Sequence, residues 1–473
     1  MTPEEFRAAG HKVIDWIADY RARVYVGDLP VMATTAPGDV RRALPSTPPD
    51  TGESFDDIMR DMDRIVVPGL SLWQHPSFFG YFPANSGLAS VLGDTLSTGL
   101  GVLGLSWQGC PALTELEEVV LDWFRQMLGL SSAWSGVIQD TASTSTMVSL
   151  ICARERASDF AFGRGGMQEG LRTLVVYTSE QAHSSVEKAA LMAGFGRDHV
   201  RHVPSDTHFS MHSASLEQLI VNDLAAGCTP CAIVATTGTT TSTAIDPVRD
   251  IAAIAKRYGV WLHVDAALAG SAMILPECRW MWEGVEEADT LVVNAHKWLG
   301  VAFDCSQYFV RDEDLLVRVM STNPSYLRST VDGEVKNYRD WGIPLGRRFR
   351  ALKMWCLIRE QGVHALQERL RRDMRNAKWL EEAVRATPDW RVLAPVPLQT
   401  VCVRHEPDGL LGAALDLHTQ RWCDALNRSG KAYLTPATLD GRWMVRVSVG
   451  SEYTEQAHVE ALWANMRAAA EHA

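Results

Sequence analysis

The sequence lacks the features that would place the protein in a membrane, outside the cell or on nucleic acid. No apolar run reaches the ~18 residues that a membrane-spanning helix needs. The first residues, Met1–Phe6, are acidic and lack the apolar core of a signal peptide. Asp and Glu (57) outnumber Lys and Arg (45), giving a net charge of −12. This balance argues against nucleic acid or an anionic membrane as the main partner.

Cysteine is also scarce. Nine cysteines are scattered over 473 residues, which is typical of a reduced cytoplasmic protein rather than a disulfide framework. Cys228 and Cys231 have the spacing of a zinc-binding pair, but no second pair or nearby histidine completes a metal site. We interpret them as the lead-in to a strand. A hydrophobic content of 46% at this length can supply a large core.

Apolar runs of strand length alternate with helical patterns in the middle of the chain. The expected strands are Leu174–Thr178, Ala232–Thr236, Val260–Val264, Thr290–Val293 and Ser306–Val310. This alternation predicts an α/β fold with a mostly parallel sheet covered by helices on both faces. We expect three regions: a helical N-terminal segment (1–84), a large α/β domain (85–362) and a small α+β domain (363–473).

One lysine stands where a strand is expected to end. Lys297 follows the apolar run Thr290–Val293, and open α/β sheets build their ligand sites at the carboxyl ends of strands. A lysine there could form a Schiff base with an aldehyde cofactor such as pyridoxal 5′-phosphate (PLP). A solvated surface lysine is the alternative.

A carboxylate ends the preceding strand. Asp265 lies 32 residues before Lys297, about one βα unit, so the two side chains are expected at neighbouring strand ends. PLP needs an acid beside its pyridine nitrogen, because a protonated ring takes up electrons from the substrate. A helix cap is the alternative role for Asp265.

Two further segments fit the same cofactor. The small residues around Ala142 and Ser143 open a helical pattern, and a helix N-terminus can bind a phosphate. His183 follows the strand Leu174–Thr178, where its imidazole could stack on the cofactor ring. Each has a common structural alternative, a simple helix cap and a core histidine.

Together these residues resemble the group II PLP-dependent decarboxylases, and in particular the aromatic L-amino acid decarboxylases. The similar segments run in family order along almost the whole chain: 75–83, 106–107, 114–117, 177–187, 235–240, 263–267 and 344–350. The resemblance implies the fold-type I, aspartate aminotransferase-like architecture and a homodimer whose N-terminal segment packs on the partner subunit. It also implies that PLP is the cofactor.

The resemblance further implies roles for individual residues. Lys297 would bind PLP, Asp265 would pair with the pyridine nitrogen and His183 would stack on the ring. The remaining cofactor-binding residues would be Ala142, Ser143, Thr240, Ala267, Asn294 and His296. The residues around the substrate side chain would be Trp73, Tyr81, Phe82, Pro83, His183 and Phe303, with Leu103, Leu105 and Gly346 from the other subunit.

Tyr326 lies in a polar stretch, 321–330, that is similar to the mobile catalytic loop of the family. By this resemblance its phenol would protonate the substrate carbon after carbon dioxide leaves. Relatives with phenylalanine there produce an aldehyde, ammonia and hydrogen peroxide instead. Because Tyr326 and His183 are both present, we expect decarboxylation, with aromatic acetaldehyde synthesis as the alternative and a non-catalytic binding protein as a remote one.

The substrate prediction is an aromatic L-amino acid. An apolar, aromatic lining favours a flat ring over a carboxylate side chain, and no cationic contact for glutamate is found. Plant relatives with glycine at the position of Gly346 take indoles, so tryptophan is favoured, with dopa, 5-hydroxytryptophan, tyrosine and phenylalanine left open. The chain departs from the family pattern at Asp140, Thr144, Leu268 and Leu105. These departures affect substrate choice and the cofactor's hydrogen bonds rather than Lys297, Asp265 or His183.

Overall fold

A computed structural model describes residues 1–166, 172–322, 331 and 333–473. These residues form two compact units. The larger unit comprises residues 84–374 and 394–400, and the smaller comprises 1–83, 375–393 and 401–473. The long helix α12 (Arg350–Arg385) contributes to both and is kinked at Gly362, whose φ is 73°. The three-part division expected from the sequence stays a prediction.

The larger unit is built on a seven-stranded sheet with the order β1-β7-β6-β5-β4-β2-β3. Its strands are β1 (Ser135–Gln139), β2 (Leu174–Ser179), β3 (Val200–Val203), β4 (Thr229–Thr236), β5 (Trp261–Asp265), β6 (Thr290–Val293) and β7 (Ser306–Val310). Only β7 runs against the others, since it is antiparallel to both β1 and β6 while the remaining pairs are parallel. The carboxyl ends of β1, β2, β4, β5 and β6 therefore share one edge of the sheet.

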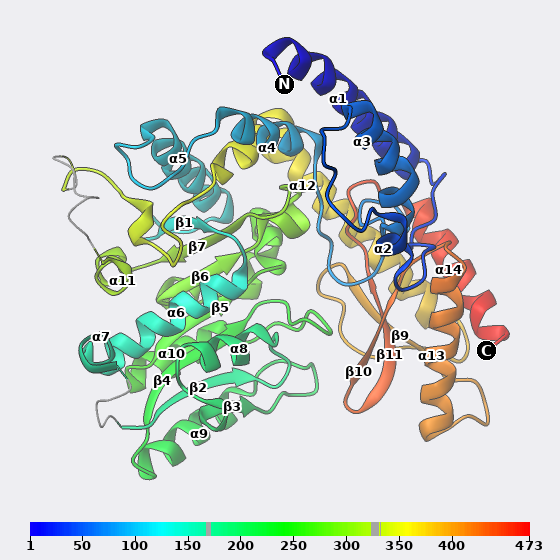
Figure 1. Ribbon diagram of the computed structural model, residues 1–473. Helices are drawn as coiled ribbons and strands as arrows, with labels where there is room; N and C mark the ends of the chain where they lie inside the picture. Colours follow the sequence, from blue (N-terminus) through cyan, green and yellow to red (C-terminus); the bar gives the residue numbers. More distant parts are fainter. Residues whose placement is uncertain (167–171, 323–330, 332) are drawn as a thin grey trace. The chain divides into compact units, whose positions relative to one another are not determined.

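Helices cover this sheet because its strands are apolar on both faces; every residue of β5 and β6 is buried. Helix α6 packs across β4 to β7, and α9 and α10 pack against β3 to β5 (Figure 1). The helices of this unit are α4 (Leu88–Leu100), α5 (Pro111–Leu128), α6 (Ala142–Ala157), α7 (Ala161–Gly165), α8 (Ser185–Met192), α9 (Ser213–Ala225), α10 (Val248–Tyr258) and α11 (Glu313–Met320). The fold is the expected α/β architecture with a mostly parallel sheet.

The smaller unit has a separate four-stranded antiparallel sheet with the order β10-β11-β9-β8. Its strands are β8 (Trp390–Val392), β9 (Thr400–His405), β10 (Thr435–Leu439) and β11 (Arg442–Ser448). Its helices are α1 (Pro3–Tyr25), α2 (Asp39–Ala43), α3 (Phe55–Asp61), α13 (Gly412–Arg428) and α14 (Gln456–Glu471). Helix α13 packs on β11 and on α14.

All five strands expected in the middle of the chain are present, two of them with the expected bounds and three shifted by up to three residues. Two strands of the larger sheet, β1 and β3, were not expected. Across the described part of the chain, each helix is too short or too polar to cross a lipid bilayer.

Candidate active site

Two parallel neighbours, β5 and β6, bring the central carboxylate and lysine to one edge of the sheet. Asp265 is the last residue of β5 and lies in register with Val292 of β6. Asn294, the residue after β6, donates its backbone N–H to the carbonyl of Ala267 at 3.0 Å. The prediction that Asp265 and Lys297 lie at neighbouring strand ends is therefore confirmed.

Lys297 lies in a short turn, Ala295–Leu299, that directly follows β6. Its backbone is not helical (φ −91°, ψ −106°), and its N–H donates to the carbonyl of Asn294 at 3.0 Å. The carbonyl of Lys297 accepts from the N–H of Asn85 at 3.3 Å, which links the turn to the segment before α4. The backbone of Lys297 is thus held by hydrogen bonds through both its N–H and its carbonyl.

Asp265 is buried, with 4% of its surface exposed. Its Oδ1 accepts the N–H of Ala267 at 3.0 Å, so one carboxylate oxygen is fixed by the backbone of the turn after β5. Ala267 therefore contacts both neighbouring strand ends, through its N–H to Asp265 and through its carbonyl to Asn294.

His183 lies between β2 and α8, and its ring is held in one orientation. Nδ1 accepts the backbone N–H of Ser185 at 3.1 Å and lies 2.8 Å from the Ser185 hydroxyl. A neutral His183 therefore carries its proton on Nε2. Burial lowers the pKa of His183; the Asp265 carboxylate opposes this effect and the Lys297 ammonium adds to it. The three residues expected to bind the cofactor ring are close enough to act on one another.

A helix N-terminus lies at the same edge of the sheet. Helix α6 begins at Ala142, three residues after β1 ends, and the side chain of its N-cap residue, Thr141, makes no capping bond. Ala142 is buried and Ser143 is exposed. The first-turn N–H groups and the Ser143 hydroxyl form a donor set of the kind that binds phosphate.

His296 is a second phosphate-binding candidate, and it is neutral. Its Nδ1 accepts the backbone N–H of Cys305 at 2.9 Å, which leaves the proton on Nε2. Burial, assisted by the Lys297 ammonium, lowers the pKa of His296 to about 3. Next to it, the buried Oδ1 of Asn294 has no hydrogen-bond partner among the described residues.

These residues fit PLP by their chemistry. The N–H and O–H donors of Ala142, Ser143 and His296 suit a phosphate dianion, and the Asp265 carboxylate suits a protonated pyridine nitrogen. Thr240 lies half-buried in the turn after β4. Gly238 makes this turn possible, because at its φ of 86° a Cβ atom would lie 2.7 Å from the side chain of Ala269.

Of the residues expected around the substrate, some belong to the larger unit and some to the smaller unit. In the larger unit, the N–H of Gly104 donates to the carbonyl of Arg347 at 2.9 Å, which brings Leu103 and Leu105 beside Gly346. A Cβ atom at Gly346 would meet one described atom within 4 Å, Leu105 Cδ2 at 4.0 Å. The ring of Phe303 lies 4.8 Å from that of His296.

In the smaller unit, the rings of Trp73 and Tyr81 stack 5.3 Å apart. Phe82 lies under the guanidinium of Arg446, and Pro83 is buried. Tyr326 lies outside the described residues.

The positions that depart from the family pattern have local structural roles. Leu268 is buried. Asp140 accepts the N–H of Thr141 through Oδ1 at 2.6 Å, so its carboxylate holds the backbone just before α6. Thr144 is half-buried in the first turn of α6.

Several supporting residues were not identified from the sequence. Asp246 is fully buried and accepts the N–H groups of Thr236 and Met211, both at 2.7 Å, which fixes the end of β4. Burial raises its pKa to about 7. Gln307 accepts the N–H of Ala295 at 3.1 Å and so supports the lysine turn. Isolated buried polar residues of this kind leave no periodic signal in a sequence.

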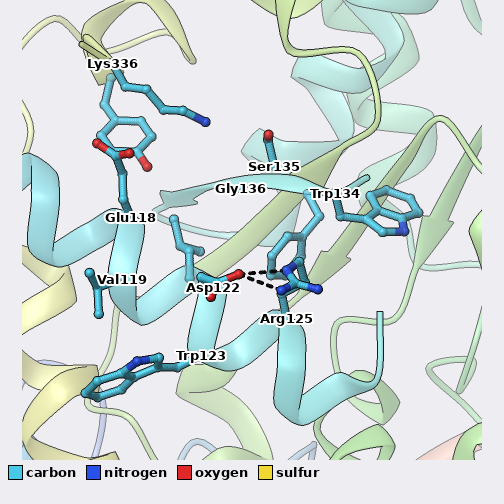
Figure 2. Close-up of a pocket in the computed structure, with 12 residues that line it drawn as sticks. Glu118, Val119, Asp122, Trp123, Arg125, Trp134, Ser135, Gly136 and Lys336 are labelled. Carbon is cyan, nitrogen blue, oxygen red and sulfur yellow. Dashed lines mark hydrogen bonds and ion pairs between the residues drawn. The ribbon is translucent and has the colours of Figure 1, made fainter. Parts of the chain in front are cut away.

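A cavity of about 490 Å³ lies elsewhere, between α5 and the edge strand β1 (Figure 2). Its lining includes Glu118 and Asp122 of α5, Ser135 and Gly136 at the start of β1, and Lys336. Asp122 is paired with Arg125 at 2.7 Å. Because Asp140–Ala142 follow the other end of β1, this cavity is separate from the cofactor-binding residues.

Comparison with known proteins identifies the family. Residues 37–406 match the pyridoxal-dependent decarboxylase conserved domain. The chain is 39% identical to phenylacetaldehyde synthase of Arabidopsis thaliana, covering 98% of this chain and 95% of that protein. It is 38% identical to tryptophan decarboxylase 2 of Oryza sativa subsp. japonica, covering 99% and 95%.

Solved structures agree. The crystal structure of Oryza sativa TDC with PLP and tryptamine is 35% identical, with a TM-score of 0.96 over 100% of this chain and 99% of that one. Catharanthus roseus tryptophan decarboxylase in complex with L-tryptophan is 38% identical, with a TM-score of 0.93 over 100% and 99%. The chain belongs to the pyridoxal-dependent decarboxylase family, in its aromatic amino acid branch, and is a PLP-dependent carboxy-lyase.

Proposed function

We propose that this enzyme decarboxylates an aromatic L-amino acid, preferably tryptophan, to the amine and carbon dioxide. The observation that carries the tryptophan preference is the space at Gly346, where a Cβ atom would meet, among the described residues, only Leu105 Cδ2 at 4.0 Å. A serine side chain at this position would fill part of this space, so glycine leaves more room for a bicyclic indole. Dopa, 5-hydroxytryptophan, tyrosine and phenylalanine are the competing substrates.

The residues divide the chemistry among them. PLP, when bound, supplies the electron sink for the bond that breaks. Asp265 would keep the ring nitrogen protonated, and Lys297 would hold the cofactor through its aldehyde. The imidazole of His183, which Ser185 holds in one orientation, would stack on the cofactor ring. The phosphate would be held by Asn294, His296, Ala142 and Ser143, beside Thr240 and Ala267.

Decarboxylation replaces the carboxylate on the substrate carbon with one proton. We propose that the phenol of Tyr326 donates it. In the alternative reaction, oxygen and water are consumed, and the aldehyde, ammonia, carbon dioxide and hydrogen peroxide are released. The relative named phenylacetaldehyde synthase makes this alternative worth testing in its own right.

The decisive experiment is a product assay in air. Purified protein with PLP receives L-tryptophan, L-dopa, L-tyrosine, L-phenylalanine or L-glutamate, and amine, aldehyde and peroxide are measured. We expect amine without matching peroxide, fastest from tryptophan. Aldehyde with stoichiometric peroxide would replace decarboxylation with the alternative reaction.

The Tyr326→Phe variant tests the proton donor. Without the phenol, the product is expected to shift from amine toward aldehyde, with amine formation reduced by roughly 100-fold. Tyr258→Phe, on α10, is the matched control and should leave the product unchanged. An unchanged amine yield from Tyr326→Phe would remove this role from Tyr326.

We also propose that the enzyme is a homodimer. Helix α4 presents Leu88, Leu92, Leu96 and Leu100 at a spacing of four residues, and each is between 40% and 60% exposed. An apolar stripe of this length favours burial against another surface, and a second copy of the chain is the proposed one. Trp73, Tyr81, Phe82, Pro83 and Phe303 are proposed to line the substrate side chain, with Leu103, Leu105 and Gly346 coming from the partner. A cytoplasmic location stays a prediction from composition.

A further inference from the structure

A fully buried lysine lies next to the predicted phosphate-binding residues. Lys353, in the first turn of α12, has 0% of its side chain exposed. Its Nζ lies 3.3 Å from Asp94 Oδ1 and makes no hydrogen bond within the described residues. Asp94 is shared, because Arg348 also approaches its carboxylate at 3.3 Å. The buried ammonium is therefore only partly compensated, which is costly in a protein interior.

The position of Lys353 follows from close packing. A Cβ atom at Gly93 of α4 would lie 2.6 Å from the Cα of Lys353, so α4 and α12 approach too closely for a larger residue. Arg350 lies one turn before both Lys353 and Met354 in α12, so it is a neighbour of each on the helix surface. Arg350 donates to Asp304 at 2.9 Å, and Gln307 Nε2 lies 3.4 Å from the sulfur of Met354.

This turn of α12 packs behind His296. The segment that receives Arg350 includes Cys305, whose N–H holds His296 Nδ1 at 2.9 Å. Gln307, which contacts Met354, also accepts the N–H of Ala295. The Lys353 ammonium contributes to lowering the pKa of His296, after burial and Lys297. Residues that neighbour Lys353 in α12 thus contact the segment that holds His296, and the Lys353 charge is near enough to act on this histidine.

We infer that Lys353 supplies a buried positive charge that favours binding of the cofactor's phosphate dianion without touching it. Three cations share two carboxylates here: Asp94 faces both Arg348 and Lys353, and Asp304 pairs with Arg350 while the charge of Lys353 also acts on it. Because the protein interior screens charge weakly, an anion bound at His296 would offset the positive charge that the nearby carboxylates leave uncompensated. Lys353 is thus a positioning residue, since it acts through the field at the phosphate site.

The test compares PLP with pyridoxal, which has the same ring and aldehyde but no phosphate. Apoenzyme is titrated with each, and binding is followed by absorbance and tryptophan fluorescence. We expect Lys353→Met to raise the Kd for PLP by about tenfold or more and to change the Kd for pyridoxal less than about twofold. Lys353→Arg should recover most of the PLP affinity. Lys378→Met, which removes an exposed lysine of the same helix, is the control.

Equal weakening for PLP and pyridoxal would show a structural role only, and unchanged PLP binding would show no contribution; either result overturns the inference. Asp94→Asn provides a second test that does not depend on the folding of Lys353→Met. Removing this carboxylate leaves Lys353 less compensated, so PLP is expected to bind more tightly and pyridoxal unchanged. Weaker PLP binding by Asp94→Asn would contradict the inference.

Discussion

The residues expected around the cofactor and those expected around the substrate differ in how the protein holds them. Asp265 and His296 are each 4% exposed and fixed by backbone N–H groups. Leu103 and Phe303 are each 63% exposed. The residues expected to bind the cofactor are therefore held in place within the single chain, whereas those proposed to line the substrate are exposed and, in the proposed dimer, would be covered by the partner subunit. Relatives of similar identity that carry different substrate names fit this division.

Removing Lys297, one of the residues expected to bind the cofactor, should have the largest effect. Lys297→Ala is expected to abolish the visible absorption band of the bound cofactor and to lower amine formation by at least about 1,000-fold. Lys256→Ala, an exposed lysine on α10, is the control. A persisting band together with near-normal turnover would mean that another residue binds the aldehyde.

Separating the proposed dimer should have the next largest effect. It should impair catalysis on the substrate without impairing cofactor binding. In Leu92→Lys/Leu96→Lys, two charges interrupt the apolar stripe of α4, so the mass from light scattering should fall to that of one chain. The value of kcat/KM is expected to drop about 100-fold while PLP still binds, because the cofactor residues belong to one chain. A monomeric variant with full activity would contradict a shared substrate site.

Buried histidines should lower the stability of the folded protein in acid. Burial lowers the pKa of His263 to about 4 and that of His296 to about 3, both below the ordinary value of 6.5. As the pH falls from 6.5 toward 4, the unfolded chain takes up protons that the folded chain does not, so stability is lost with falling pH.

At pH 5 each such histidine costs about 2 kcal/mol of unfolding free energy relative to pH 7. Denaturant unfolding of the apoenzyme at the two pH values measures this loss, and His263→Gln should reduce it by about the share of one histidine. His472→Asn, near the chain end, is the control. Protonation of the buried Asp246 carboxyl acts in the opposite direction over the same pH range, so the difference between wild type and His263→Gln is the quantity that isolates the histidine. An equal pH dependence of the two proteins would contradict the assignment of His263 as neutral and buried.

The smallest expected effect is a change of substrate choice. Gly346→Ser places a hydroxyl beside Leu105, so the ratio of kcat/KM for tryptophan to that for tyrosine should fall by about tenfold. Competition assays with both amino acids measure this ratio directly. A comparable loss for both substrates would indicate damage to the site rather than altered selectivity.

The sequence predicted that Lys297, Asp265 and His183 share one edge of the sheet because each follows a run that is recognisable as a strand, and parallel strands end at one edge. The roles of the other expected cofactor-binding residues came from the resemblance and stay predictions. Strand β1 was missed because it is short and contains Gly136, which weakens the strand pattern. Asp246, Gln307 and Lys353 were missed because their importance arises from burial among residues distant in the chain. Pairing of the N-terminal helices with the C-terminal sheet in one unit is likewise a long-range property.

One buried ion pair anchors the backbone beside Gly346, the position proposed to select the substrate. Glu117 and Arg347 lie 2.5 Å apart with almost no exposure, and both also bind the backbone of Ile138 in β1. The residue next to Arg347 is Gly346, so the backbone at this position is anchored to the central sheet whatever side chain it carries. Substitutions at residue 346, the position proposed to select the substrate, are therefore expected to leave the backbone and the sheet intact.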